Sequence, residues 1–235
     1  MYTSDVKLPE NKTKSTNTKP QYPTKTVESR QIIAETISPN QKDSLFWCLY
    51  IIDSGYNEFQ QITRNHRVRQ IEIQSKVIEH IQKNKGIMKN TNMKFTNIAV
   101  QEVMSDLLTI TKEINYQVAM SLCVLYNINV YMIDKEKQVY LKFISNTDVE
   151  LPIYAIYRED NNTYSVDIEA ITTDKLTEIE KMICLESYLR PLKTISNYKI
   201  TELMEQAQKF GLLEEDKKYK KQELYELVYN KIRWT

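Results

Sequence analysis

The chain has little glycine, few cysteines and almost no histidine. Its 235 residues include 3 Gly, 3 Cys and 2 His. A structural zinc site needs about four clustered Cys or His ligands, and the positions of these residues supply no such cluster. We therefore expect no metal and no cofactor. The odd number of cysteines (Cys48, Cys123 and Cys184), each in an apolar stretch with a helical pattern, argues against a disulfide framework and indicates buried free thiols in a reducing compartment.

Long apolar runs and a net charge are also missing. No run reaches the roughly 18 to 20 apolar residues that span a bilayer, and Lys and Pro occupy the N-terminal region where a secretory signal would be apolar. These absences predict a soluble intracellular protein with no membrane partner. The 32 basic and 31 acidic residues leave a net charge of +1, so nucleic-acid binding would require a local basic patch.

Residues 1–38 are rich in Pro, Lys, Thr and Ser and contain almost no large apolar side chains. Such a segment cannot bury enough apolar surface to offset the entropy lost on ordering. The composition therefore predicts a disordered tail over 1–38.

Residues 39–190 show a helical period first and a strand period later. The run from Leu45 to Ile52 is apolar on nearly every face, which predicts a buried central helix. Further helices are predicted over residues 67–84, 112–126 and 174–188. Alternating apolar residues predict two hairpins, which pair 130–133 with 139–143 and 153–157 with 164–168. This order predicts an α+β domain in which helices precede antiparallel hairpins.

Residues 191–235 form a smaller second unit. Two apolar stripes predict a helix-loop-helix, with Gly211 as the left-handed cap of the first helix. The stripes are Leu203, Ala207 and Phe210, then Leu224, Leu227, Val228 and Ile232.

The loop between these helices is a candidate contact site. Its residues are Lys217, Lys218, Tyr219, Lys220 and Lys221, which offer four cations around one aromatic ring and fit a phosphate backbone. The acidic residues 214–216 adjoin them. A charged solvated loop on a hairpin that docks on protein therefore fits the pattern equally well.

Three segments within residues 40–168 resemble the ovarian-tumour (OTU) family of papain-like cysteine peptidases. That family begins its central helix with Asp-Gly-Asn-Cys-Leu-Phe, where this chain has Asp43-Ser44-Leu45-Phe46. The family's middle helix feeds a strand, as residues 117–123 lead into 129–134 here. Its last segment is a strand, a polar turn and His-Tyr, where this chain has residues 153–157 followed by Asn161-Asn162-Thr163-Tyr164. The resemblance implies a papain-like α+β fold and a protein partner, either ubiquitin-like or viral.

On this resemblance Ser44 stands at the nucleophile position and Thr163 at the general-base position. Thiolate chemistry needs a cysteine at the helix N-terminus and an imidazole within hydrogen-bond reach. Both are absent, so the resemblance implies a degenerate, non-catalytic site. The alternative is an active cysteine peptidase or deubiquitinase that uses Cys48 with His66 or His80. Burial inside an apolar helix would raise the pKa of that thiol, and both histidines fall in a charged helix.

The C-terminal unit resembles the SAP module, whose helix, extended loop and helix contact DNA. The segments that carry this likeness are residues 199–203, 209–212 and 220–225. Together with 43–48 and 192–199, they look like a group of proteins encoded by large nucleocytoplasmic DNA viruses. That likeness implies a location in the host cytoplasm, a viral factory or the virion, but no activity. We therefore expect a non-catalytic binding or scaffolding protein, and a virion structural component would share the same sequence features.

Overall fold

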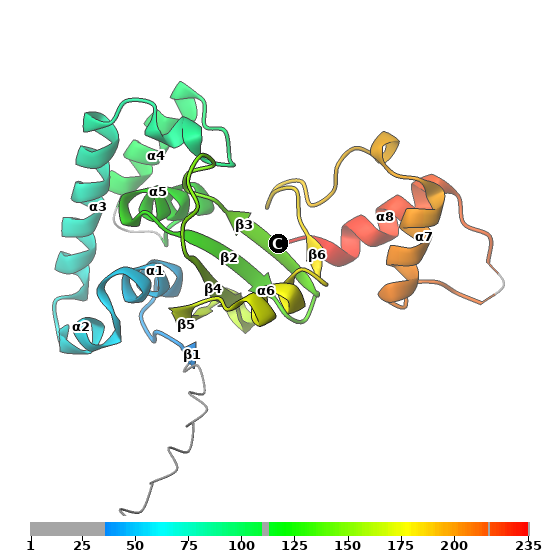
Figure 1. Ribbon diagram of the computed structural model, residues 1–235, viewed down its shortest axis with the longest axis horizontal. Helices are drawn as coiled ribbons and strands as arrows, with labels where there is room; N and C mark the ends of the chain where they lie inside the picture. The colour runs from blue at the N-terminus through cyan, green and yellow to red at the C-terminus, as the bar shows by residue number, and fades with distance from the viewer. Residues whose placement is uncertain (1–35, 110–112, 216, 235) are drawn as a thin grey trace, which may run out of the picture. The chain divides into compact units, whose positions relative to one another are not determined.

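The computed structural model describes residues 36–109, 113–215 and 217–234 (Figure 1). The predicted disordered tail falls on residues 1–35, outside the described residues, except for its last three positions. Two of these form the short strand β1 (Thr36–Ile37), which pairs with a strand of the central sheet. The end of the predicted tail is therefore part of the fold. Its backbone pairs with β5, and amino-acid composition does not indicate such pairing.

A six-stranded mixed sheet with the strand order β1-β5-β4-β2-β3-β6 lies at the centre (Figure 1). The remaining strands are β2 (Asn129–Asp134), β3 (Val139–Phe143), β4 (Ile153–Arg158), β5 (Tyr164–Ala170) and β6 (Ile183–Cys184). The two predicted hairpins, β2–β3 and β4–β5, are confirmed as antiparallel pairs. However, β2 pairs with β4 in parallel, as does β3 with β6, so the sheet is not purely antiparallel. Hairpin patterns report only strands that are neighbours in sequence.

The described residues contain eight α-helices and three short 3₁₀ segments. The α-helices are α1 (Ser44–Ser54), α2 (Tyr56–Gln61), α3 (His66–Lys83), α4 (Asn97–Leu108), α5 (Tyr116–Tyr126), α6 (Thr173–Ile179), α7 (Ile200–Lys209) and α8 (Lys221–Ile232). The 3₁₀ segments are η1 (Ile87–Asn90), η2 (Asp160–Asn162) and η3 (Ile195–Asn197). This content confirms the α+β class. The helix predicted over 112–126 begins only at Tyr116, since the Asn115 side chain caps it by accepting a hydrogen bond from the Val118 amide at 2.9 Å.

The helix predicted over 174–188 is wrong in its second half. Helix α6 ends at Ile179, and the chain then forms β6 along the edge of the sheet. The amides of Ile183 and Leu185 donate to carbonyls of residues 138 and 140 at 3.0 and 2.9 Å. This pairing turns Cys184 outward, so it is exposed and not buried as the sequence predicts.

Two apolar layers cover opposite faces of the sheet. Val130 and Met132 belong to the larger core, which also contains buried residues of α1, α3, α4 and α5. Tyr131 and Ile133 belong to a smaller core with Ile179 of α6. This division follows from the alternation of side chains along a strand. Helix α1 is buried continuously over residues 44–51, which confirms the predicted central helix.

The C-terminal unit is the predicted helix-loop-helix. Helices α7 and α8 bury Leu203, Ala207, Leu224 and Val228. Gly211 follows α7 with φ +64°, which is the left-handed conformation expected of its cap. None of the helices in the described part of the chain is long and apolar enough to cross a membrane.

Candidate functional site

Helix α1 begins beside the start of strand β5. Asp43 caps the helix by accepting a hydrogen bond from the Phe46 amide at 3.2 Å. The next side chain, Ser44, is only 4% exposed, and its Oγ accepts a hydrogen bond from the Tyr164 amide at 3.0 Å. The two segments that the sequence resemblance aligns with a nucleophile and a base therefore meet in space, with Ser44 in contact with the residue after Thr163.

These two side chains do not form a proton-transfer pair. Thr163 is exposed, and its hydroxyl donates to the carbonyl of Asp160 at 3.0 Å. A serine hydroxyl becomes a nucleophile only when a neighbouring base accepts its proton. Threonine is no such base, so this geometry positions the backbone of β5 against α1.

Cys48 lies one turn further along α1, inside the larger core. It is fully buried. Burial, with smaller contributions from the negative charges of Asp43 and Glu159, raises the pKa of the Cys48 thiol. A thiol that stays protonated is a poor nucleophile.

The two histidines have other partners. His66 packs edge-on against Trp47 with ring centroids 5.1 Å apart, and its Nε2 lies 3.1 Å from Nε2 of Gln41. His80 Nδ1 lies 3.4 Å from the side-chain amide of Asn84. Neither arrangement prepares an imidazole to deprotonate a buried thiol.

Asp43 ties three segments together at the same end of α1. Its Oδ2 accepts hydrogen bonds from Gln70 Nε2 and from the Ile114 amide, both at 3.0 Å. Burial raises the pKa of this carboxyl from 3.8 to about 6, and the charge of Glu113 acts in the same direction. The hydrogen bonds oppose the shift but do not cancel it.

A cleft of about 470 Å³ extends outward from Ser44, and we refer to it as the Ser44 cleft. Residues from α1, the start of α5, the β4–β5 turn and the end of the chain line it. They include Ser44, Ile114, Tyr116, Arg158, Tyr164 and Trp234.

The indole of Trp234 forms part of the wall of this cleft and is 1% exposed. Its Nε1–H donates to the hydroxyl of Tyr116 at 2.6 Å, and that hydroxyl lies 2.7 Å from the hydroxyl of Tyr164. Because Tyr116 already accepts from the indole, its own proton is free to point at Tyr164. Burial raises the pKa of Tyr164, with Tyr116 adding to the effect, so the Tyr164 hydroxyl stays neutral.

Two cationic side chains hold the backbone that carries the indole. Lys137 Nζ donates to the carbonyl of Arg233 at 2.6 Å, and Arg158 Nη1 donates to the carbonyl of Trp234. The Arg158 guanidinium carbon also lies 5.4 Å from the centroid of the indole ring. Charge-assisted hydrogen bonds of this kind are about twice as strong as neutral ones.

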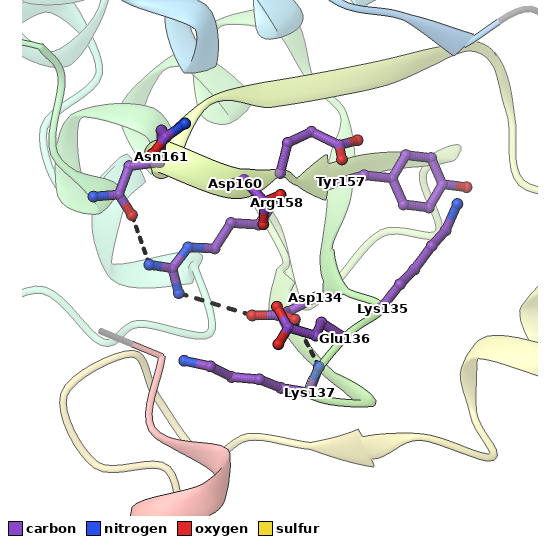
Figure 2. Close-up of a pocket in the computed structure, with 10 residues that line it drawn as sticks. Asp134, Lys135, Glu136, Lys137, Tyr157, Arg158, Asp160 and Asn161 are labelled. Atoms are coloured by element: carbon purple, nitrogen blue, oxygen red, sulfur yellow. Dashed lines mark hydrogen bonds and ion pairs between the residues drawn. The ribbon is translucent and has the colours of Figure 1, made fainter.

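Figure 2 shows the two cations, with Lys137 in the turn after β2 and Arg158 at the end of β4. Asp134 lies 3.9 Å from Arg158 Nη1, and its other oxygen accepts from the Lys137 amide at 2.8 Å. Asn162 accepts from Arg158 Nη2 at 2.6 Å. An adjoining pocket of about 500 Å³ lies between the same turns and shares Arg158 and Asn162 with the Ser44 cleft.

The lysine-rich loop lies elsewhere, between α7 and α8. Lys217 forms an ion pair with Glu214 at 2.9 Å and lies 5.1 Å from the centroid of the Tyr219 ring. Lys218 and Lys220 are exposed, and Lys221 is half-buried as the first residue of α8. One of the four predicted phosphate contacts is therefore engaged by an acidic neighbour.

Sequence reasoning missed Lys137, Arg158 and Trp234. The one available signal is that Trp234, one of only two tryptophans, follows the last apolar position of an amphipathic helix. Its partners lie about 76 to 118 residues away in the chain, so no local pattern connects them.

No protein-family model, curated protein or solved structure matches the chain. Within the described residues, no group of three or more His, Cys, Asp or Glu side chains is placed to hold a metal ion.

Proposed function

We propose that the protein is a non-catalytic binding or scaffolding protein, in which an OTU-like α+β domain engages a protein partner without cleaving it. The observation that carries this proposal is the hydrogen bond from the Tyr164 amide to Ser44 Oγ at the N-terminus of α1. At that position the resemblance requires a thiolate and a neighbouring imidazole. The chain instead has a buried serine and, at the second position, a threonine.

The alternative peptidase would depend on Cys48. Its complete burial and the raised pKa of its thiol argue against an attack on any substrate.

The test is a thiol-reactive ubiquitin probe, together with a ubiquitin-conjugate hydrolysis assay, on the full-length protein. We expect no hydrolysis and no labelling that depends on Cys48. Cys184 is exposed, so the Cys184→Ser variant controls for incidental labelling at that thiol. Labelling that survives Cys184→Ser and disappears in Cys48→Ser would contradict the proposal.

A second candidate function is nucleic-acid binding by the C-terminal unit, favoured by the exposure of Lys218 and Lys220 immediately before α8. Each phosphate contact on duplex DNA releases about 0.9 counterion, so binding should weaken steeply with salt. The test compares duplex DNA binding by the full chain at low and moderate salt with that of a variant in which Lys217, Lys218, Lys220 and Lys221 become Glu.

A matched control changes four exposed lysines elsewhere to Glu, namely Lys76, Lys85, Lys89 and Lys94. Binding that the loop variant abolishes and the control retains supports the loop as the contact. Absence of binding at low salt, or equal loss in both variants, contradicts it.

The likeness to proteins of large nucleocytoplasmic DNA viruses supports, as part of the same proposal, a place in the host cytoplasm, the viral factory or the virion. Proximity labelling in infected cells would identify the partner. Mass spectrometry of purified virions would separate a packaged structural component from a protein confined to the cell.

A further inference from the structure

Arg233 and Trp234 are held in the manner of a bound extended peptide. Arg233 has φ −51° and ψ 132°, so the chain leaves α8 in an extended conformation. Two successive carbonyls then accept hydrogen bonds from Lys137 and Arg158, and the indole donates to Tyr116. These contacts involve only two backbone carbonyls and one indole. Any extended segment that carries a tryptophan has the same groups.

The groups that make these contacts belong to the α+β domain alone. Tyr116 begins α5, Lys137 lies in the β2–β3 turn, and Arg158 ends β4. Asp134 lies beside the Arg158 guanidinium and accepts from the Lys137 backbone amide, and Asn162 accepts from Arg158. The receiving side of the contact is therefore complete without the C-terminal helices.

The C-terminal unit attaches to the α+β domain through few polar contacts. Among the described residues, the hydrogen bonds between residues 198–234 and the α+β domain are those of Arg233 and Trp234 and one from Lys209 Nζ to the carbonyl of Lys181 at 2.7 Å. Leu203, Leu224 and Val228 of the helix pair belong to the larger core together with Trp234, so release of the 233–234 segment would withdraw one buried side chain from that core and leave the other residues of the helix pair packed in it.

We propose that the Ser44 cleft is a receptor site for an extended partner peptide that carries a tryptophan, and that Arg233–Trp234 is its occupant in cis. This inference rests on the proposed non-catalytic binding function and specifies the class of partner. The partner's indole replaces that of Trp234 against Tyr116, and its carbonyls accept from Lys137 and Arg158. The adjoining pocket of about 500 Å³ leaves room for the partner's residues on the Arg158 side of the cleft.

The tethered occupant competes strongly with a partner. A segment joined to its site by a short linker has an effective concentration in the millimolar range. A free peptide with the same contacts therefore binds the intact protein weakly, and removal of the Trp234 side chain exposes the intrinsic affinity.

The test uses full-length protein and a synthetic peptide with the sequence of residues 228–234, acetylated and amidated, with binding measured by calorimetry. We expect the Trp234→Ala variant to bind the peptide at least about tenfold more tightly than the wild type does. A peptide in which alanine replaces tryptophan should bind neither protein.

Specificity within the cleft is tested on the Trp234→Ala background. Tyr116→Phe removes the acceptor of the indole N–H and should weaken peptide binding several-fold. Tyr56→Phe, at a ring that stacks on Phe59 with centroids 6.1 Å apart and does not line the cleft, should leave binding nearly unchanged. Equal affinity of both proteins for the peptide, or no binding to a folded Trp234→Ala variant, would overturn the inference.

If Trp234→Ala does not fold, as judged by circular dichroism, wild-type protein labelled with 5-fluorotryptophan provides the second measurement. It has two resonances, from Trp47 in the core and from Trp234. Peptide added well above the roughly millimolar effective concentration of the tethered segment should move one of them to the position of an exposed tryptophan, and no movement of either at that concentration overturns the inference.

Mass spectrometry of the peptide after each experiment separates the two proposals. A peptide that is cleaved contradicts the non-catalytic function. An intact peptide that does not bind overturns only the receptor site.

Discussion

The buried carboxyl of Asp43 should make the stability of the protein depend on pH in an unusual direction. Its side chain is 7% exposed and its pKa is raised to about 6, chiefly by burial. A raised folded-state pKa means that the protonated carboxyl stabilises the fold at pH values below about 4, the unfolded-state pKa. This contribution is lost as the pH rises through about 6.

The magnitude follows from the two pKa values. The difference between 3.8 and about 6 corresponds to about 3 kcal/mol of unfolding free energy. Asp43→Asn removes the titration, because an amide is neutral throughout this range. The substitution also replaces the acceptor oxygen that faces Gln70 Nε2 and the Ile114 amide with an NH₂ group, which is a donor. The loss of an acceptor for such buried donors costs about 1–3 kcal/mol.

The assay is urea unfolding of the wild type and Asp43→Asn at pH 4 and pH 7.5. We expect the variant to be less stable than the wild type by about 1–3 kcal/mol at pH 4, and the difference in stability to shift in favour of the variant by about 2 kcal/mol between pH 4 and pH 7.5. Asp53→Asn, at an exposed position near the end of the same helix, serves as the control and should change stability little.

A gap that stays constant between the two pH values, or widens as the pH rises, would refute this reasoning. Widening would mean that the three hydrogen bonds to Asp43 favour the ionised carboxylate more than burial opposes it.

Three further changes have defined outcomes in thermal or urea unfolding. Ser44→Ala leaves the buried amide of Tyr164 without its acceptor and should cost about 1–3 kcal/mol, whereas a loss below about 0.5 kcal/mol would show that this hydrogen bond contributes little. Lys175→Met removes the cation paired with Asp167; burial acts to raise the Asp167 pKa, but hydrogen bonds led by that of Lys175 keep it lowered. The wild type should therefore lose this stabilisation as the pH falls through the lowered pKa, and the variant, less stable at neutral pH, should lose less on acidification. Gly211→Ala meets no atom within 4 Å but requires a left-handed alanine, so it should cost about 1–2 kcal/mol, and an unchanged stability would contradict the left-handed cap.

The local periodicity of apolar side chains was sufficient to predict most of the helices and strands. The continuous apolar run that forms α1, the helical pattern of α3 and the alternation in β2 through β5 each depend on residues close in sequence. Helix α4 was missed although its signals are present: Thr96 accepts from the Ala99 amide at 3.2 Å as the cap, and Val103 and Leu107 are buried four residues apart.

The sequence by itself determined the α+β class, the two hairpins and the helix-loop-helix, because these follow from side-chain period and turn chemistry within short windows.

Only the tertiary structure decided the parallel pairing of β2 with β4, the outward position of Cys184 and the burial of Trp234. Each depends on groups far apart in the chain, whose pairing follows from the backbone and side-chain partners left unsatisfied once the local elements have formed. Arg158 meets the Trp234 carbonyl across 76 residues, and no pattern in a short stretch of sequence contains both partners.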